Sequence, residues 1–258
     1  MSGRGRTGPS RARRSDGLKD RLRTRAIDLA ELMDDPDCDP VRLDRTYRRF
    51  ELINALVSGW RETFRTRIAP VLVGRRVPAR ILDLGCGGGD LARALARRAS
   101  ATGIPVEVVG IDPDERAIRA AKRRTTDGVS FRVASSGDLV AAGEVFDVVV
   151  SNHVLHHLHA DDRDAFFADS AALATSLVVH SDIRRSPGAY RSYAAAAPFI
   201  APGTFVLVDG LRSIRRSYTA AELRDAAPAG WSIAEQAPHR VLAVREAPGR
   251  SIKASAAP

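Results

Sequence analysis

The sequence RILDLGCGGGDLARALARRA, residues 80–99, constrains the fold more than any other stretch of the chain. Its first five residues form an apolar run that predicts a buried strand, and residues 91–99 show the apolar spacing of a helix. Glycines stand between them at Gly85, Gly87 and Gly89, where a chain can turn tightly and let a ligand approach its backbone. The stretch therefore predicts a strand, a glycine-rich turn and a helix in direct succession.

The same alternation of strand and helix continues along the chain. Strand-like runs occupy residues 106–112, 129–134, 145–151 and 176–182, and helical patterns occupy residues 114–124 and 162–174. This repetition predicts a parallel sheet with helices on both faces. A helix at 219–227 precedes two strand-like runs, 231–238 and 239–246, which are close enough to pair as an antiparallel ribbon.

The charge and the cysteines narrow the class of protein. The net charge is +9, but only three of the 40 basic residues are lysine, which indicates a compositional bias and not a phosphate-binding face. We expect no nucleic-acid partner. No apolar run approaches the ~18–20 residues of a membrane span, and no apolar segment follows the basic N-terminus. Two cysteines, Cys38 and Cys86, cannot form a disulfide framework, so we expect a cytoplasmic protein.

Two acidic residues indicate what the glycine turn binds. Asp83 lies in the strand just before the turn, and Asp112 ends the second strand. A pyrophosphate needs helix-end amides without an anion beside them, so Asp83 favours a ligand with positive charge, such as an ammonium or a sulfonium. Asp112 stands where dinucleotide folds place the acid that binds ribose hydroxyls. A ligand that combines these groups is S-adenosylmethionine.

At these residues the chain resembles the class I S-adenosylmethionine-dependent methyltransferases. DLGCGGG (83–89) is similar to their D-x-G-x-G-x-G signature, GIDPD (110–114) to their second acidic motif, and FDVVVSNHVLHHL (146–158) to their fourth-strand motif. The resemblance covers roughly residues 78–182. It implies an α/β fold with a Rossmann-like seven-stranded, mostly parallel sheet whose last strand is antiparallel, helices on both faces, an N-terminal helical cap and an inserted lid.

The expected organisation has four parts and one insertion. They are a disordered basic tail (1–26), a helical cap (27–76), a methyltransferase core (77–247) that contains a lid (183–217), and a C-terminal tail (248–258). Within the first two parts, apolar residues at helical spacing predict helices over 20–34, 43–57 and 60–70.

The resemblance also implies cofactor contacts. Asp83 and the backbone of the glycine turn would hold the methionine end, and Asp112 the ribose, with Pro113 beside the adenine. The residues expected at the cofactor are Asp83, Gly85, Cys86, Gly87, Gly89, Asp112, Pro113, Ser135, Ser136, Asn152 and His153. The family's adenine-binding aspartate after the third strand is missing from RVASSGDL (132–139). Ser135, Ser136 or a shifted Asp138 remain alternatives for its role.

SNHVLHHLH (151–159) places four histidines at the expected ligand-binding edge of the sheet. A metal site would need a further acidic or cysteine ligand, and the nearby Asp161 and Asp162 are typical of a helix start, so we expect no metal. Some of these rings could also simply pack or face water.

For His156 and His157 we favour catalysis. Histidine can remove the proton of a hydroxyl acceptor near neutral pH, and Asp182 at the end of the fifth strand could orient the imidazole or bind the acceptor. Small-molecule O-methyltransferases with a His-His pair after strand four resemble this arrangement. His180, inside the strand, is expected in the core.

Two stretches indicate the acceptor. FELINALVS (50–58) resembles the Y-D-x-M-N-x-x-M-S stretch of ubiquinone/menaquinone-biosynthesis methyltransferases, with Asn54 and Ser58 identical. The segment 183–217 combines aromatic residues with arginines, which suits a flat, mostly apolar acceptor. We expect O-methylation of a phenolic or polyketide-type small molecule in secondary metabolism, with C-methylation of a quinone precursor as the alternative. SNHV (151–154) lacks the proline-containing motif typical of nucleic-acid base methylation.

Overall fold

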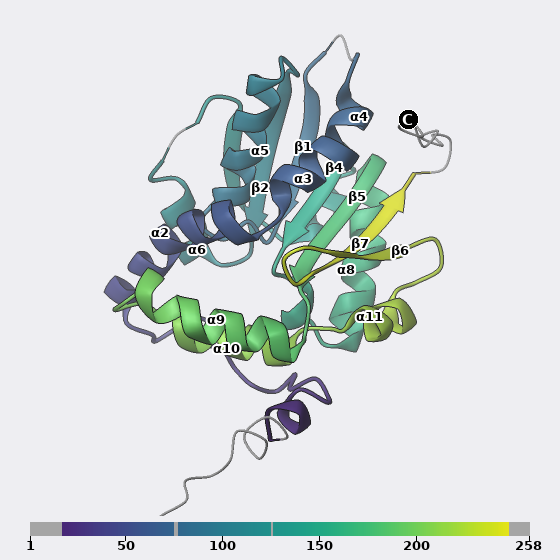
Figure 1. Ribbon diagram of the computed structural model, residues 1–258. Coiled ribbons are helices and arrows are strands. Elements are labelled where there is room, and N and C mark those ends of the chain that lie inside the picture. The colour runs from purple at the N-terminus through teal and green to yellow at the C-terminus, as the bar shows by residue number, and fades with distance from the viewer. Residues whose placement is uncertain (1–16, 75–76, 125, 248–258) are drawn as a thin grey trace, which may run out of the picture.

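The computed structural model describes residues 17–74, 77–124 and 126–247, and its centre is a seven-stranded sheet (Figure 1). The strand order is β3-β2-β1-β4-β5-β7-β6. The strands are β1 (Ala79–Leu84), β2 (Val106–Asp112), β3 (Val129–Val133), β4 (Phe146–Asn152), β5 (Ala174–Ile183), β6 (Ser232–Gln236) and β7 (Arg240–Glu246). β1 to β5 pair in parallel, and β7 is antiparallel to both β5 and β6. The expected Rossmann-like fold is confirmed.

Helices cover both faces of the sheet because successive strand residues point to opposite sides. On one face, Ile81 and Val148 belong to a core with α3 (Trp60–Thr63), the π-helical turn η1 (Phe64–Ile68), α4 (Ala69–Leu72), α5 (Asp90–Ala101) and α6 (Glu115–Ala121). On the other face, Leu82 and Val149 pack with α7 (Ser136–Ala141) and α8 (Ala160–Leu173), and α8 also packs with α11 (Ala220–Ala226). The buried alternation in each strand therefore fixes two separate hydrophobic layers.

The N-terminal region differs from the expectation. The helix predicted over residues 20–34 is wrong: only residues 17–21 are helical, and residues 26–39 cross the molecule without regular structure. We call residues 26–39 the strap. The expected tail 1–26 is also too long, because Leu22 is buried and the Ala26 N–H donates to the Arg215 carbonyl. The rest of the expected N-terminal tail (1–16) and the whole expected C-terminal tail (248–258) lie outside the described residues.

Tertiary hydrogen bonds explain why the strap is not a helix. The backbone N–H groups of Leu32 and Met33 donate to Asp209 at 2.8 and 3.0 Å, and Arg116 donates to carbonyls of the strap, including that of Asp35 at 2.8 Å. Backbone groups that would form helical bonds are thus satisfied by side chains from elsewhere. The helix α2 (Pro40–Val57) begins directly after the strap, and the Asp39 side chain caps its first turn.

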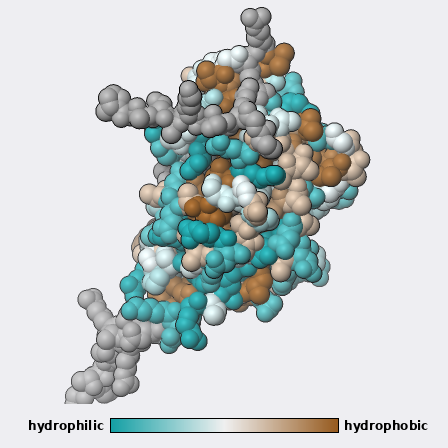
Figure 2. Space-filling view, turned by 90° about the vertical axis from the view of Figure 1, so that its right-hand side faces the viewer, coloured by the Kyte–Doolittle hydropathy of each residue, from teal (hydrophilic) through white to brown (hydrophobic). Residues whose placement is uncertain are grey.

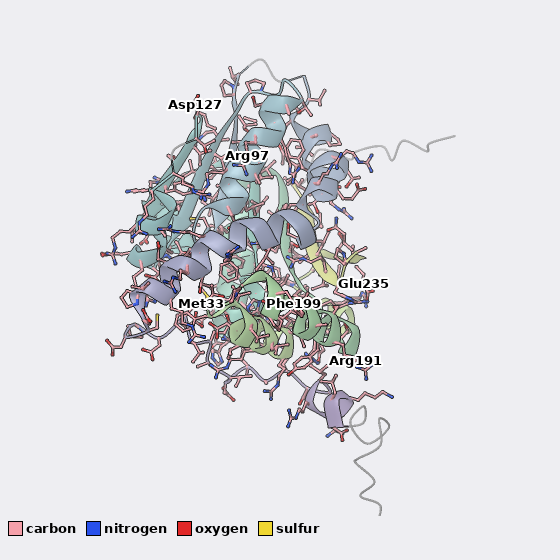
Figure 3. All side chains as sticks on the ribbon, turned by 60° about the vertical axis from the view of Figure 1, so that its left-hand side comes forward. Met33, Arg97, Asp127, Arg191, Phe199 and Glu235 are labelled. Atoms are coloured by element: carbon pink, nitrogen blue, oxygen red, sulfur yellow. The ribbon has the colours of Figure 1, made fainter. Side chains whose placement is uncertain are left out.

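Residues 183–217 form two helices where the sequence indicated a mixed segment. They are α9 (Pro187–Ile200) and α10 (Val206–Arg216), which lie side by side below the sheet in Figure 1. Pro198 inside α9 and Gly203 between the helices obscured the pattern. The Tyr193 hydroxyl donates to the Val206 carbonyl at 2.6 Å and joins the two helices. In Figure 3, Phe199 of α9 lies below α2, whereas Asp127 lies above it.

The surface carries little continuous apolar area on the face seen in Figure 2, where hydrophobic residues occur as separate patches among hydrophilic ones. Among the described residues, no helix has both the length and the apolar character needed to cross a lipid bilayer.

His180 lies in the core, as its position within β5 predicts. It is fully buried, its Nδ1 is 2.8 Å from Ser151 Oγ, its Nε2 is 3.0 Å from Ser170 Oγ, and its ring stacks on Trp231. Burial lowers the pKa of His180 to about 3. The folded protein therefore keeps this ring neutral over a pH range in which the unfolded chain protonates it.

This difference predicts a loss of stability in acid. Between pH 7 and 5 the unfolded state binds a proton at residue 180 and the folded state does not, so the free energy of unfolding falls as pH falls, by ~2 kcal/mol for this group. Urea unfolding at both pH values should show a smaller acid loss for His180→Asn, by about that amount. Equal acid losses for the variant and the unchanged protein would contradict the assignment.

Candidate active site

A cavity of about 650 Å³ opens at the carboxyl ends of the central strands. The glycine turn and the ends of β2 and β4 form one wall, α2 and the strap form a second, and α9 with α10 forms a third. Parallel α/β sheets bind their ligands at this edge, and the volume is in the range of small-molecule sites. Eight of the eleven residues expected at a cofactor line this cavity, whereas Gly89, Ser135 and Ser136 do not.

The glycine turn between β1 and α5 has the geometry that the sequence predicts. Gly85, Gly87 and Gly89 all have positive φ, at 65°, 51° and 75°. A Cβ atom on Gly85 would lie 2.6 Å from Val154 Cγ2, and one on Gly89 would lie 2.4 Å from Phe131 Cζ. Side chains are therefore excluded at both positions, and the backbone itself forms the cavity wall. Cys86 lies within this turn, between Gly85 and Gly87, and its buried thiol lines the cavity.

Asp83 brings a buried carboxyl group to the cavity. Its side chain is 1% exposed, it lines the cavity, and its Oδ2 has no hydrogen-bond partner among the described residues. Burial and then the neighbouring Asp90 raise the pKa of Asp83 well above its ordinary value. A buried carboxylate without a partner is costly, so this site favours a ligand that presents a cation to Asp83.

Asp112 is held in a fixed orientation by the backbone. Its Oδ2 accepts from the Gly87 N–H and its Oδ1 from the Asp114 N–H, both at 2.9 Å. The second strand thus clamps the glycine turn through one carboxylate. Pro113 follows it and also lines the cavity, together with Tyr47 of α2.

The end of β4 is fixed by a residue that the sequence did not reveal. The buried Arg240 of β7 donates to Asn152 Oδ1 at 2.5 Å and contacts His153 Nε2 at 2.8 Å. His153 has a φ of 63°, which is uncommon for a non-glycine residue. Burial and the charge of Arg240 hold the pKa of His153 well below its ordinary value. His153 is therefore a neutral ring whose Nε2 accepts from the guanidinium.

Ser135 and Ser136 lie elsewhere, which differs from the expectation that one of them contacts the adenine. Neither lines the cavity. Ser135 caps α7 in a reciprocal capping box with Asp138, and the Ser136 hydroxyl donates to Asp169 at 2.7 Å. The S-x-x-D spacing is the signature of this local structure. The side chains of Ser135, Ser136 and Asp138 therefore already have partners within the protein.

His156 lies between two carboxylates. Its Nδ1 is 2.8 Å from Asp182 Oδ1, its backbone N–H donates to Asp182 Oδ2 at 2.9 Å, and its Nε2 is 3.2 Å from Glu31 Oε1. The last contact lacks the alignment of a hydrogen bond, so Nε2 has no such partner among the described residues. Asp182 does not line the cavity and therefore orients His156 instead of contacting an acceptor.

These carboxylates change the proton affinity of His156. Burial alone would lower the pKa of His156, but Asp182 and then Glu31 outweigh it and raise that pKa to about 9. Burial would likewise raise the pKa of Glu31, but His156 lowers it to about 2. Without another cation, His156 is protonated at neutral pH and is not a free base.

His157 is the histidine of the pair that reaches the open cavity. Its side chain is 32% exposed, its Nδ1 is 3.3 Å from Asp34 Oδ2, and its Nε2 is 3.9 Å from Glu31 Oε1. The rings of His156 and His157 are 4.2 Å apart between centroids. His159 is exposed and lies at the start of α8.

Glu31 is the acid that sequence reasoning missed. It comes from the strap, is 4% exposed, and also accepts from the Ser213 hydroxyl of α10 at 2.8 Å. No local motif surrounds it, because its role arises only when the strap folds over the end of β4.

Comparison with known proteins agrees with this geometry. Residues 81–175 match the family model described as a methyltransferase domain. The ubiquinone biosynthesis O-methyltransferase of Mesorhizobium japonicum is 41% identical over 92 residues, 34% of each chain, and that of Cereibacter sphaeroides is 34% identical over 125 residues, 47% of this chain and 48% of the relative. The chain thus matches about a third to a half of the length of these relatives.

Most of the residues expected to bind S-adenosylmethionine line the cavity, and all of them lie within the matched residues 81–175. Residues 81–175 are therefore similar to a methyltransferase domain, and the curated relatives share this similarity over part of their length.

Solved methyltransferases share the fold over nearly the whole chain. The plantazolicin methyltransferase BpumL, in complex with a desmethyl-plantazolicin analogue and S-adenosylhomocysteine, has a TM-score of 0.57 at 12% identity and covers 91% of this chain and 98% of its own. The magnesium protoporphyrin IX methyltransferase of Synechocystis, with bound S-adenosylmethionine, has a TM-score of 0.50 at 18% identity and covers 83% and 99%. The methyltransferase fold therefore extends well beyond residues 81–175.

The position of Asp112 predicts a specific loss of cofactor affinity. Asp112→Asn leaves one acceptor oxygen where two backbone N–H groups now donate, so the clamp on the glycine turn is weakened. We expect S-adenosylmethionine to bind about tenfold more weakly, which corresponds to ~1.4 kcal/mol, in calorimetric titrations. Asp127→Asn, an exposed site at the far end of the sheet in Figure 3, is the control and should bind normally. Unchanged affinity in Asp112→Asn would contradict this role.

Proposed function

We propose that this protein transfers the methyl group of S-adenosylmethionine to a hydroxyl oxygen of a small, mostly apolar aromatic acceptor, such as a phenol of polyketide type. The observation that carries the proposal is the division of the cavity into two chemically different ends. Asp83, Asp112 and the glycine turn line one end, and the cluster of Glu31, His156 and His157 lines the other. A cofactor at the first end would direct its methyl group toward the second.

The walls around the cluster support an apolar acceptor. They are formed by Phe50 and Ile53 of α2 and by Tyr193, Ala197 and Val206 of the α9–α10 pair. Apolar surface with a few polar groups at one end is typical of small-molecule sites. We propose that α2, the strap and the α9–α10 pair together act as the acceptor's cover, in the way expected of a cap and a lid. The enclosure also favours a small molecule over a nucleic-acid acceptor.

The cluster supplies what methyl transfer to oxygen requires. The reaction breaks the bond from sulfur to the methyl carbon and forms the bond from oxygen to that carbon, and the acceptor must lose its proton. A phenol has a pKa near ~10 and is a poor nucleophile until that proton leaves. His157, exposed to the cavity and paired with Asp34, is placed to assist this loss, and Asp182 holds the neighbouring His156. The relatives from ubiquinone biosynthesis are O-methyltransferases, which supports oxygen over carbon as the acceptor atom.

The variant His157→Gln tests this proposal. It should lower turnover by about 10²–10⁴-fold, measured as labelled methyl transferred from S-adenosylmethionine to a panel of phenols and phenolic polyketides. Calorimetric binding of S-adenosylmethionine should stay within about twofold of the unchanged protein, because His157 forms no hydrogen bond with Asp83 or Asp112 among the described residues.

His159→Ala is the matched control, since it removes an exposed histidine of the same stretch, and it should keep full turnover. Mass spectrometry of the product then locates the new methyl group. Transfer to carbon, or normal turnover in His157→Gln, would overturn the assignment of an O-methyltransferase with this cluster.

A further inference from the structure

We propose that Glu31, His156 and His157 form a binding site for one divalent transition-metal ion, which holds the acceptor's oxygen during methyl transfer. The sequence indicated no metal because a third, acidic ligand was missing beside the histidines. The structure supplies that ligand from the strap. This inference rests on the proposed function only for what the ion does, and not for whether the ion binds.

The three ligand atoms converge on one point. Glu31 Oε1 is 3.2 Å from His156 Nε2 and 3.9 Å from His157 Nε2, and all three atoms lie within 4.8 Å of one another. Ligands bound to a zinc-sized ion at ~2.0–2.2 Å are separated by roughly 3.0–3.5 Å, so small side-chain movements would close this triangle around an ion. Two histidines and one carboxylate are a known ligand set for divalent transition metals.

An unsatisfied nitrogen points into this triangle. His156 is 1% exposed, and its Nε2 has no hydrogen-bond partner among the described residues, although Glu31 lies only 3.2 Å away. A hydrogen bond at that distance would need better alignment. A metal ion bound to Nε2 and to the carboxylate would satisfy both groups without that alignment.

Each histidine also carries the outer partner that metal-bound histidines require. Asp182 Oδ1 lies 2.8 Å from Nδ1 of His156, and Asp34 Oδ2 lies 3.3 Å from Nδ1 of His157. A carboxylate on the far nitrogen fixes the tautomer that presents Nε2 to the metal. Ser213 completes the set by donating to Glu31 Oε1 at 2.8 Å. The alternative group of His153, His156 and Asp182 is less suitable, because both Asp182 oxygens already accept from His156.

The charges around the triangle favour a cation. Glu31, Asp34 and Asp182 bring three carboxylates to the two rings, and the guanidinium of Arg216 lies 3.9 Å from Glu31 and 3.6 Å from Asp34. Arg240 lies on the other side of Asp182, beside His153. Imidazole ligands suit zinc, iron, nickel or copper better than magnesium, calcium or manganese.

A metal at this position would narrow the class of acceptor. An ion with three protein ligands keeps open positions, and an acceptor with a phenol hydroxyl beside a second oxygen could occupy two of them. Binding to the ion lowers the pKa of the hydroxyl, so its proton leaves to water or to Asp34, and the oxygen then attacks the methyl carbon as sulfur departs. His157 would then act as a ligand that promotes proton loss and not as the base itself.

Metal binding can be measured without cofactor or acceptor. Untagged protein, dialysed against a chelator, is titrated with Zn²⁺ by calorimetry and with Co²⁺ by visible absorption. We expect one Zn²⁺ per chain, and Co²⁺ bands of nitrogen and oxygen coordination without a thiolate charge-transfer band. Glu31→Gln and His157→Gln should each weaken Zn²⁺ binding at least 100-fold. Asp34→Asn, at a half-exposed position, should weaken it about 10–100-fold.

His159→Ala is the matched control and should bind Zn²⁺ normally. The proposal is overturned if the unchanged protein binds no more Zn²⁺ than the double variant Glu31→Gln/His157→Gln, or if the Co²⁺ complex shows thiolate coordination. Binding of S-adenosylmethionine is measured on the same samples. If the unchanged protein binds S-adenosylmethionine but no Zn²⁺, this inference alone is refuted. If it binds neither, the proposed function is refuted as well.

Discussion

The unpaired carboxylate oxygen of Asp83 is the interaction on which the site depends. The sheet buries this side chain at the end of β1, beside the glycine turn, and its Oδ2 has no hydrogen-bond partner among the described residues. Such an arrangement costs several kcal/mol in an empty protein, and a cationic ligand offsets that cost. Because Asp112 accepts from the Gly87 N–H of the same turn, the carboxyl groups of Asp83 and Asp112 are both anchored to it.

The opposite end of the cavity depends on contacts between distant parts of the chain. Glu31 reaches the histidines because α10, through Asp209 and Ser213, and Arg116 of α6 hold the strap in place. The α9–α10 pair therefore both shapes the acceptor's space and positions the acid that completes the histidine cluster.

Local patterns predicted most of the fold and the cofactor end of the site. The order of strands and helices, the positive φ values at Gly85 and Gly89, and the places of Asp83 and Asp112 all follow from residues that are close in the sequence. Glu31 and Arg240 could not be found in this way, since each acquires its role from a partner more than 80 residues away. Ser135 was misinterpreted although its signal was present, because S-x-x-D starts a helix. The helix expected over 20–34 failed because tertiary hydrogen bonds outweighed its apolar spacing.

The role of Asp83 can be isolated by comparing two ligands and two proteins. S-adenosylmethionine carries the ammonium and sulfonium, whereas 5′-methylthioadenosine has the same nucleoside without either charge. Calorimetric titration should show that Asp83→Asn removes most of the preference for S-adenosylmethionine and leaves the affinity for 5′-methylthioadenosine nearly unchanged. Equal losses for both ligands, or an unaltered preference in Asp83→Asn, would show that this carboxylate does not recognise the cation.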